Sequence, residues 1–368
     1  MSRVSLRNVT KKCPNNDMVV KNFSLDIEEG EFVVLTGMAG CGKTLVIRMI
    51  AGLEECDSGD ICIDDEIVND METKDRGVAM VFRNYTLYPN MNVYDNMAFA
   101  LKMERLPANE ISRRIRETAE FMEMESLLER MPSELTEEQT IQAVIGRAVA
   151  KEPRVLLMDD TLGRLTGESK KFIEEKMVAL NRKMGIPFIY ATQGQEEAMD
   201  MASRIVIMNE GEIVQAGSPA ELYEHPAKTF VALFLGDPHI NMVQAEVVSR
   251  KNGCELKLGE NTISLTKEQK TVLEQSGSMG KNVFLGIRPE DMEIAGKKTG
   301  EGKGLIRQAI VESYEEKGGR RYLCASLDEA RWTVPAGEKE LPKGEAVDLA
   351  FSTEKAHIFC AETGELIR

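Results

Sequence analysis

Residues 37–44 read Gly-Met-Ala-Gly-Cys-Gly-Lys-Thr and fit the phosphate-binding loop pattern G-x-x-x-x-G-K-[ST]. Residues 32–36 before the loop are apolar and β-branched, as in a strand of a buried parallel sheet, and residues 46–53 after it continue as an amphipathic helix. The motif requires this order of strand, loop and helix. The alternative is a glycine-rich turn between a strand and a helix that binds no ligand.

The residue types in this loop suit a phosphate ligand. Gly37, Gly40 and Gly42 would let backbone N–H groups wrap a phosphate without a side-chain clash. We expect Lys43 to reach the terminal phosphates and Thr44 to hold Mg²⁺. The loop therefore predicts a bound phosphate and its metal ion.

Composition limits the class of protein. A length of 368 residues predicts about two domains, and 42% apolar with 29% charged residues is ordinary for a soluble protein. A net charge of −15 argues against a nucleic-acid partner, because phosphate backbones are held by Lys and Arg. The seven cysteines form no C-x-x-C pair, and the first residues lack an apolar segment, so we expect a reducing, cytoplasmic location.

The order of patterns along the chain predicts an α/β domain followed by an all-β domain. Alternating residues predict a strand from Val4, a turn at 14–17 and a further strand pair through 18–27. Helical signals at about 84–150 predict an inserted helical subdomain. Apolar strands at 155–158, 188–191 and 205–208 predict a mainly parallel sheet that binds ligand at the carboxyl ends of its strands. We place the domains at 1–236 and 237–368, the second resembling a β-barrel.

The chain resembles the ATP-binding subunits of ABC importers, most closely the maltose and oligosaccharide importer branch, through the loop and five further segments: 48–54, 78–82, 87–89, 93–99 and 285–291. The resemblance implies a P-loop ABC-type nucleotide-binding domain with an inserted helical subdomain, followed by an OB-like regulatory domain. It also implies ATP and Mg²⁺ as ligands. The implied phosphate-binding residues are Gly37, Gly40, Cys41, Gly42, Lys43, Thr44 and Leu45, and the implied metal ligands are Thr44 and Asp159.

The same resemblance implies partners and a location. Such subunits form head-to-tail dimers, so we expect a homodimer or a heterodimer with an intact ATP-binding subunit. We also expect transmembrane permease subunits as partners, and a peripheral position on the inner face of the cell membrane. Residues 83–103 correspond to the segment where family members receive the permease. The alternative is that the aromatic and apolar side chains of this segment only pack the helical subdomain.

Several positions depart from the family pattern. Cys13 stands where an aromatic ring would stack on adenine, and Leu45 where a second hydroxyl is expected. Arg83 replaces a glutamine that helps to hold Mg²⁺ and water. Asp160 replaces the general-base glutamate and is one methylene shorter, and Gln193 replaces the switch histidine. Residues 163–166 also lack the aspartate that would link two sites across a dimer.

The signature segment departs furthest. It reads Leu135-Thr136-Glu137-Glu138-Gln139 where the family has Leu-Ser-Gly-Gly-Gln. A carboxylate about 4 Å from a phosphate costs on the order of 4 kcal/mol at an effective dielectric constant of about 20. The same residues also fit a capping box at the start of a helix, with acidic charge favoured by the helix dipole.

These departures lead to a functional hypothesis. We expect an ATP-binding subunit of a sugar-type importer that retains weak Mg-ATP binding and has impaired or no hydrolysis, with a regulatory or scaffolding role. The alternative is an active ATPase subunit that energises carbohydrate uptake. A third reading is a decayed gene product with no selected role.

Overall fold

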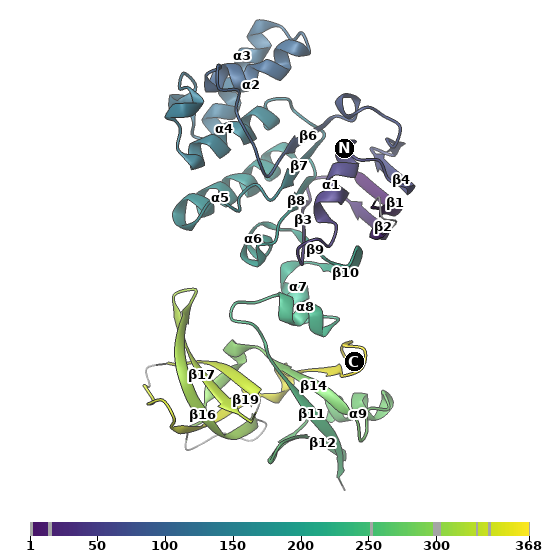
Figure 1. Cartoon of the computed structure of the whole chain (residues 1–368), viewed down its shortest axis with the longest axis vertical. Coiled ribbons are helices and arrows are strands. Elements are labelled where there is room, and N and C mark those ends of the chain that lie inside the picture. The colour runs from purple at the N-terminus through teal and green to yellow at the C-terminus, as the bar shows by residue number, and fades with distance from the viewer. Residues whose placement is uncertain are drawn as a thin grey trace. The chain divides into compact units, whose positions relative to one another are not determined.

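The computed structural model describes residues 3–13, 17–250, 253–296, 303–328, 330–337 and 340–367 (Figure 1). It divides into two compact units, Met1–Ala220 and Glu221–Arg368. The sequence-based boundary at 236/237 would instead assign the short helices α7 (Pro219–Glu224) and α8 (Thr229–Phe234) to the first domain. Within the described residues, no helix combines the length and apolar character needed to cross a membrane.

A mainly parallel sheet forms the centre of the first unit, with strand order β10-β9-β3-β8-β7-β6. Strands β3, β7 and β8 are buried along their whole length, which explains their near-continuous apolar sequence. Only β10 runs antiparallel, against β9. The strands are β3 (Phe32–Gly37), β6 (Val78–Val81), β7 (Val155–Asp159), β8 (Phe188–Ala191), β9 (Arg204–Asn209) and β10 (Glu212–Gly217).

A second, antiparallel sheet has the order β2-β1-β4-β5. One apolar cluster joins β1, β2 and β4 to helix α1 and the central sheet, so both sheets share a core. The turn expected at 14–17 lies largely outside the described residues, and the strand pair expected through 18–27 is wrong because this segment is one continuous strand. The strands are β1 (Val4–Lys12), β2 (Met18–Ile27), β4 (Ser58–Ile63) and β5 (Glu66–Ile67).

Helices cover the central sheet and form the inserted subdomain. Figure 1 shows α2, α3 and α4 grouped together beyond the β6 edge of the sheet. Helix α3 buries Ile111, Ile115 and Ala119, the apolar face expected from its periodicity. The helices are α1 (Lys43–Ala51), α2 (Val93–Met103), α3 (Ala108–Phe121), α4 (Glu137–Val149), α5 (Gly167–Met184) and α6 (Gln195–Met201), with 3₁₀ turns η1 (Thr73–Asp75), η2 (Glu125–Leu127) and η3 (Pro132–Glu134).

The second unit is mainly β, as expected. Its two sheets have the orders β13-β12-β11-β14-β20 and β15-β19-β16-β17-β18, and residues of both form one core around the buried Trp332. The elements are β11 (Asn241–Arg250), β12 (Gly253–Leu258), β13 (Asn261–Ser264), α9 (Lys267–Gln275), β14 (Asn282–Ile287), η4 (Pro289–Asp291), β15 (Met292–Ile294), β16 (Lys303–Lys317), β17 (Arg320–Leu327), β18 (Ala330–Pro335), β19 (Ala346–Ser352), η5 (Thr353–Lys355) and β20 (His357–Cys360).

Candidate functional site

The loop between β3 and α1 has a backbone that its glycines make possible. Gly37 and Gly42 have φ of 140° and 103°, in the region that favours glycine. A Cβ at Gly37 would lie 2.0 Å from the carbonyl oxygen of Met208, and one at Gly42 would lie 2.8 Å from that of Val19. Side chains are therefore excluded at both positions. The loop backbone at the start of α1 thus forms a cradle whose N–H groups would bind a phosphate.

Lys43 lies inside this loop. Its Nζ donates to the carbonyl oxygens of Gly37 at 2.8 Å and Met38 at 3.0 Å, and the residue is buried. The ammonium group is thus held beside the cradle, where it would meet a phosphate. The positive charge that the sequence predicts here is present, and its hydrogen bonds to the loop keep it in place.

Thr44 and Asp159 come from distant parts of the sequence and meet at this site. The Thr44 hydroxyl donates to Asp159 Oδ1 at 2.8 Å, which joins the start of α1 to the carboxyl end of β7. Within the described ranges no group of three or more His, Cys, Asp or Glu side chains is arranged to hold a metal. Mg²⁺ keeps several waters and phosphate oxygens, so a hydroxyl and one carboxylate fit it when nucleotide is present. The loop and this pair fit Mg-ATP.

Arg83 and Asp160 are distant in the sequence and form an ion pair in the structure. Arg83 Nε lies 3.2 Å from Asp160 Oδ2, with the two side chains 64% and 19% exposed. Burial raises the pKa of Asp160, and the Arg83 guanidinium opposes this rise. Asp160 also has a positive φ of 44°. The residue at the general-base position is therefore already engaged by a cation.

Glu197 on α6 binds residues of β8 and of the segment that follows it. It was not among the site residues expected from the sequence. Its Oε2 accepts hydrogen bonds from the Tyr190 hydroxyl at 2.7 Å and the Thr192 hydroxyl at 2.6 Å, and Lys170 Nζ lies 2.7 Å from Oε1. Burial and Glu197 raise the pKa of Tyr190. One signal was available: Glu197 is four residues before Met201, on the buried face of α6.

Gln193 lies next to this buried network but is itself exposed. Its neighbour Thr192 is buried, and the Thr192 hydroxyl also accepts a hydrogen bond from the Gly194 N–H at 2.9 Å. The backbone at the switch position is thus anchored on both sides, whereas the Gln193 side chain points into an accessible region. Its proposed contact with the terminal phosphate stays a prediction.

The signature segment forms the capping box that its sequence favours. The Thr136 hydroxyl accepts from the Gln139 N–H at 3.2 Å, and the Gln139 side chain accepts from the Thr136 N–H at 3.1 Å. Leu135 precedes the cap and is half-buried, while Glu137 is exposed and Glu138 half-buried in the first turn of α4. Two carboxylates therefore occupy this helix N-terminus, where they interact favourably with the helix dipole.

The structure describes the surroundings of Leu45 and Cys41, but those of Cys13 only in part. Leu45 packs against the apolar cluster shared by the two sheets. Cys41 is buried, with its Sγ 3.5 Å from Lys43 Nζ. Cys13 is half-buried and its N–H donates to the Asp17 carbonyl oxygen, but residues 14–16 lie outside the described part of the chain. The expected adenine position is therefore not tested.

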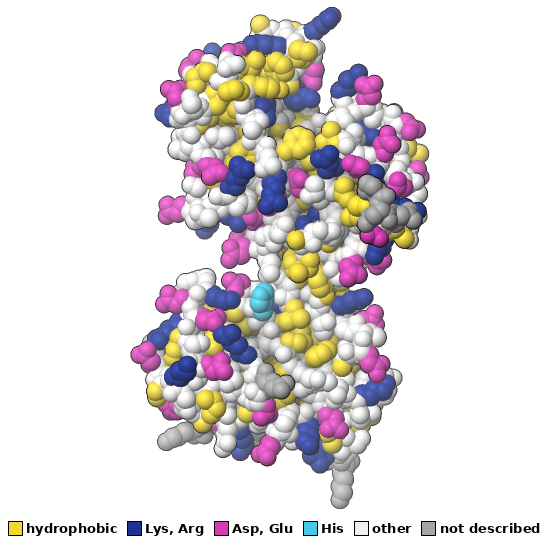
Figure 2. Space-filling model, in the orientation of Figure 1, with side chains coloured by type: hydrophobic (Ala, Val, Ile, Leu, Met, Phe, Trp, Pro, Cys, Tyr) yellow, Lys and Arg dark blue, Asp and Glu magenta, His cyan; other side chains and the backbone are white. Residues whose placement is uncertain are grey.

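The segment 83–103 is divided between core and surface. Tyr85 and Leu87 are buried in the subdomain, as the packing alternative expects, whereas Tyr88 is 45% exposed. The Tyr88 and Phe99 rings are in contact in a tilted arrangement, with their centroids 5.0 Å apart. Figure 2 shows hydrophobic side chains gathered on the face of the helical subdomain. The segment therefore both packs the subdomain and presents apolar surface.

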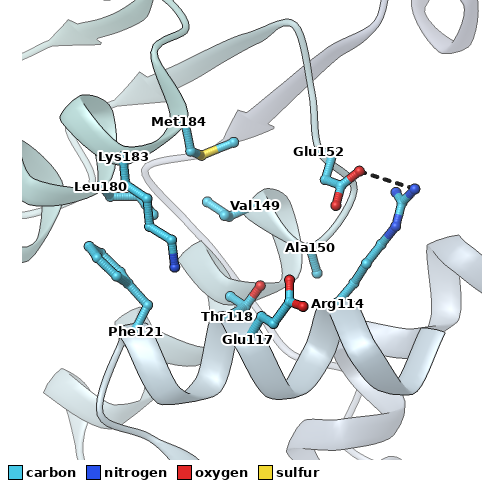
Figure 3. Close-up of a pocket in the computed structure, with 10 residues that line it drawn as sticks. All are labelled: Arg114, Glu117, Thr118, Phe121, Val149, Ala150, Glu152, Leu180, Lys183 and Met184. Carbon is cyan, nitrogen blue, oxygen red and sulfur yellow. Dashed lines mark ion pairs between the residues drawn. The ribbon is translucent and has the colours of Figure 1, made fainter. Parts of the chain in front are cut away.

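A small cavity of about 150 Å³ lies away from the loop, between α3, α5 and the end of α4 (Figure 3). An ion pair between Arg114 and Glu152 at 3.1 Å borders it on one side. On the other side Lys183 Nζ lies 4.4 Å from the centre of the Phe121 ring. None of the site residues expected from the sequence lines this cavity, so it is separate from the phosphate site.

Comparison with known proteins identifies the family. Residues 20–163 match the family model described as ABC transporter, and residues 236–292 match the model described as MalK OB fold domain. The second match covers β11–β14 and η4 of the second unit. The fold class expected from the sequence is confirmed.

The chain is 41% identical to the trehalose/maltose import ATP-binding protein MalK of Thermococcus litoralis, over 95% of each chain. It is 37% identical to the multiple sugar-binding transport ATP-binding protein MsmK of Streptococcus mutans, over the full length of both. The solved dimeric structure of MJ0796, a bacterial ABC transporter cassette, matches 59% of this chain and 98% of that one, with a TM-score of 0.53 and 27% identity. This chain therefore belongs to the family of ABC transporter ATP-binding proteins, in the group that carries a MalK-type OB-fold domain.

Proposed function

We propose that this chain is the ATP-binding subunit of a sugar-type importer, and that it binds Mg-ATP but hydrolyses it slowly or not at all. The solute class is supported by the relatives, whose names refer to trehalose, maltose and multiple sugars. Nucleotide binding is supported by the glycine cradle, Lys43 and the Thr44–Asp159 pair. Bound Mg²⁺ would neutralise phosphate charge in this site.

The observation that carries slow hydrolysis is the Arg83–Asp160 ion pair. A general base must reach the attacking water with a free oxygen, and one oxygen of Asp160 is bonded to the Arg83 guanidinium, although burial raises the pKa of the carboxyl. Aspartate is also one methylene shorter than glutamate, and a misplacement of about 1 Å can reduce a rate about a hundredfold. Two acidic residues at the start of α4 add repulsion toward any phosphate that approaches that helix.

The comparisons favour the alternative of an active ATPase subunit over the slow subunit. The relatives that match along nearly the whole chain are named as import or transport ATP-binding proteins, which favours a subunit that energises uptake. Under this alternative Asp160 acts as the base after Arg83 moves away. The two proposals agree on nucleotide binding and on transport, and they differ in the rate of phosphate release.

The partners and the location are part of the same proposal. Dimerisation is supported by the dimeric ABC cassette that shares this fold, and the dimer would be formed with a second copy or with an intact ATP-binding subunit. Permease subunits would bind at 83–103, where Tyr88 is exposed, and would hold the chain at the inner face of the cell membrane. Co-purification with a membrane protein, lost on Tyr88→Ala, tests this contact. Unchanged co-purification would argue against it.

The rate of ATP hydrolysis is measured on the purified full-length protein. Mg-ATP affinity is measured by calorimetry, and phosphate release is then followed for hours, with Lys43→Ala as the control that lacks the loop cation. Binding without release supports the slow subunit. Release at about 1 s⁻¹ or faster, in the range of ordinary enzymes, would support the active alternative instead. Absence of Mg-ATP binding in the wild type would reject both.

A restored variant sharpens the test. It carries Arg83→Gln, Glu137→Gly, Glu138→Gly, Asp160→Glu and Gln193→His, which return these five positions to the family pattern. We expect it to release phosphate at least tenfold faster than the wild type, since repositioning a general base is worth about 10²–10⁴ in rate. Equal rates would show that these positions do not limit hydrolysis.

A further inference from the structure

We propose that Arg83 is a ligand for the terminal phosphate of ATP, and that Asp160, bonded at Nε, holds its guanidinium in position while the outer N–H groups bind the phosphate. The proposal rests on the proposed function, because it requires nucleotide in the loop. It goes further by giving the chain a residue that distinguishes ATP from ADP. The family position is a glutamine, whereas the guanidinium is a feature of this chain.

The sheet register places Arg83 at the site. Strands β6 and β7 are parallel neighbours, with Val81 opposite Met158. Arg83 and Asp160 each lie two residues beyond this pair, at the carboxyl edge of the sheet, where they form their ion pair. Asp159 is at the same edge and accepts the hydrogen bond from Thr44 at the start of α1. Arg83 is therefore next to the residues that would hold the metal and phosphates.

The guanidinium has donors to spare. It carries five N–H groups, and the ion pair with Asp160 uses Nε. The Arg83 side chain is 64% exposed, so its outer N–H groups are accessible to a ligand. Arginine binds a phosphate through two parallel hydrogen bonds as well as it binds a carboxylate. The contact between Nε and Asp160 can therefore persist while the outer N–H groups bind a phosphate.

The charges around the site favour a phosphate as the ligand of Arg83. Asp159 and Asp160 place two carboxylates at the end of β7, and these would repel a triphosphate without a nearby cation. Lys43 Nζ is bonded to the loop carbonyls, and Gln193 carries no charge. Arg83 supplies the additional positive charge at this edge. Because ADP lacks the terminal phosphate, only ATP would gain from it.

The test compares the affinities of the full-length protein for ATP and for ADP, each with Mg²⁺, by calorimetry. Loss of one hydrogen bond to a charged group corresponds to roughly tenfold or more in affinity. We therefore expect Arg83→Gln to weaken ATP binding about tenfold and to change ADP binding less than about twofold. Asp160→Asn, which releases the guanidinium, is expected to keep or raise the preference for ATP.

Arg164→Gln is the matched control, because Arg164 lies over Tyr85 and bonds to Asn84, beside Arg83, rather than to Asp160. It should leave the ratio of ATP to ADP affinity unchanged. An unchanged or increased preference for ATP in Arg83→Gln would overturn the inference, and so would an equal loss in Arg164→Gln. If wild-type protein binds neither nucleotide, the proposed function fails first, whereas normal ADP binding with no effect of Arg83→Gln rejects this inference alone. ADP binding also reports that each variant is folded.

Discussion

Replacing Glu197 by alanine should destabilise the first unit strongly. The carboxylate is buried and has three partners, Lys170, Tyr190 and Thr192, at 2.6–2.7 Å. In Glu197→Ala the Lys170 ammonium, whose side chain is 23% exposed, loses its carboxylate, and the two hydroxyls lose their acceptor. The substitution therefore removes one negative charge and leaves three hydrogen-bond donors without their acceptor.

The magnitude follows from these contacts. Removing one partner of a buried ion pair costs about 3–5 kcal/mol, mostly because the other charge is left uncompensated. Each hydroxyl that loses a charged acceptor adds about 1–3 kcal/mol if it stays buried, and rotation toward water or the partial exposure of Lys170 reduces the sum. We expect a loss of about 3–5 kcal/mol in the free energy of unfolding of the first unit.

Urea unfolding followed by two probes measures this loss. Far-UV circular dichroism at the helical band reports mainly the first unit, which contains the long helices α2–α5. Fluorescence of Trp332, the chain's one tryptophan, reports the second unit, where it is buried. The dichroism transition of Glu197→Ala should move to lower urea, and the fluorescence transition should move less.

Glu196→Ala is the matched control, since Glu196 is the neighbouring carboxylate and is exposed. Its free energy of unfolding should stay within about 0.5 kcal/mol of wild type. A loss below about 1 kcal/mol in Glu197→Ala, or equal losses in the two variants, would refute the reasoning that the buried network anchors the segment after β8.

Two further predictions concern single residues. Burial raises the pKa of Glu174 to about 7 from an unfolded value near 4.5, so the folded protein binds this proton more tightly. Its stabilising contribution is complete below about pH 4.5 and is lost, by up to about 3 kcal/mol, as pH rises through 7. Glu174→Gln should flatten this part of the stability–pH curve, and an unchanged slope would contradict the assignment. Thr136→Ala should cost about 1 kcal/mol in urea unfolding through loss of the cap on α4. Thr166→Ala, at an N-cap without a side-chain bond, should cost much less, and equal losses would count against the capping box.

Local signals in the sequence predicted much of the fold. The strand, loop and helix around residues 37–44 were recognised because glycine spacing and apolar runs act over a few residues. The capping box at Thr136 was predicted for the same reason, since its two hydrogen bonds span three residues. The strand pair expected through 18–27 was wrong. Alternation of apolar and polar residues indicates a strand, but it does not show whether the segment forms one strand or two.

The candidate site was predictable only in part. Lys43, Thr44 and Asp159 belong to short motifs, and the structure brings Thr44 and Asp159 together as expected. Glu197 was missed, because one charged residue within a short helix gives a weak sequence signal and its partners come from α5 and β8.

The phosphate loop, the βα order and the cap on α4 follow from local sequence, because they depend on neighbours within a turn or a strand. The pairing of Arg83 with Asp160, by contrast, is visible only once the chain is folded. That contact depends on β6 and β7 being parallel neighbours in one register, and strand pairing joins residues far apart in the chain. Read alone, the two residues are isolated substitutions, whereas side by side at the sheet edge they form one charged unit beside the phosphate loop.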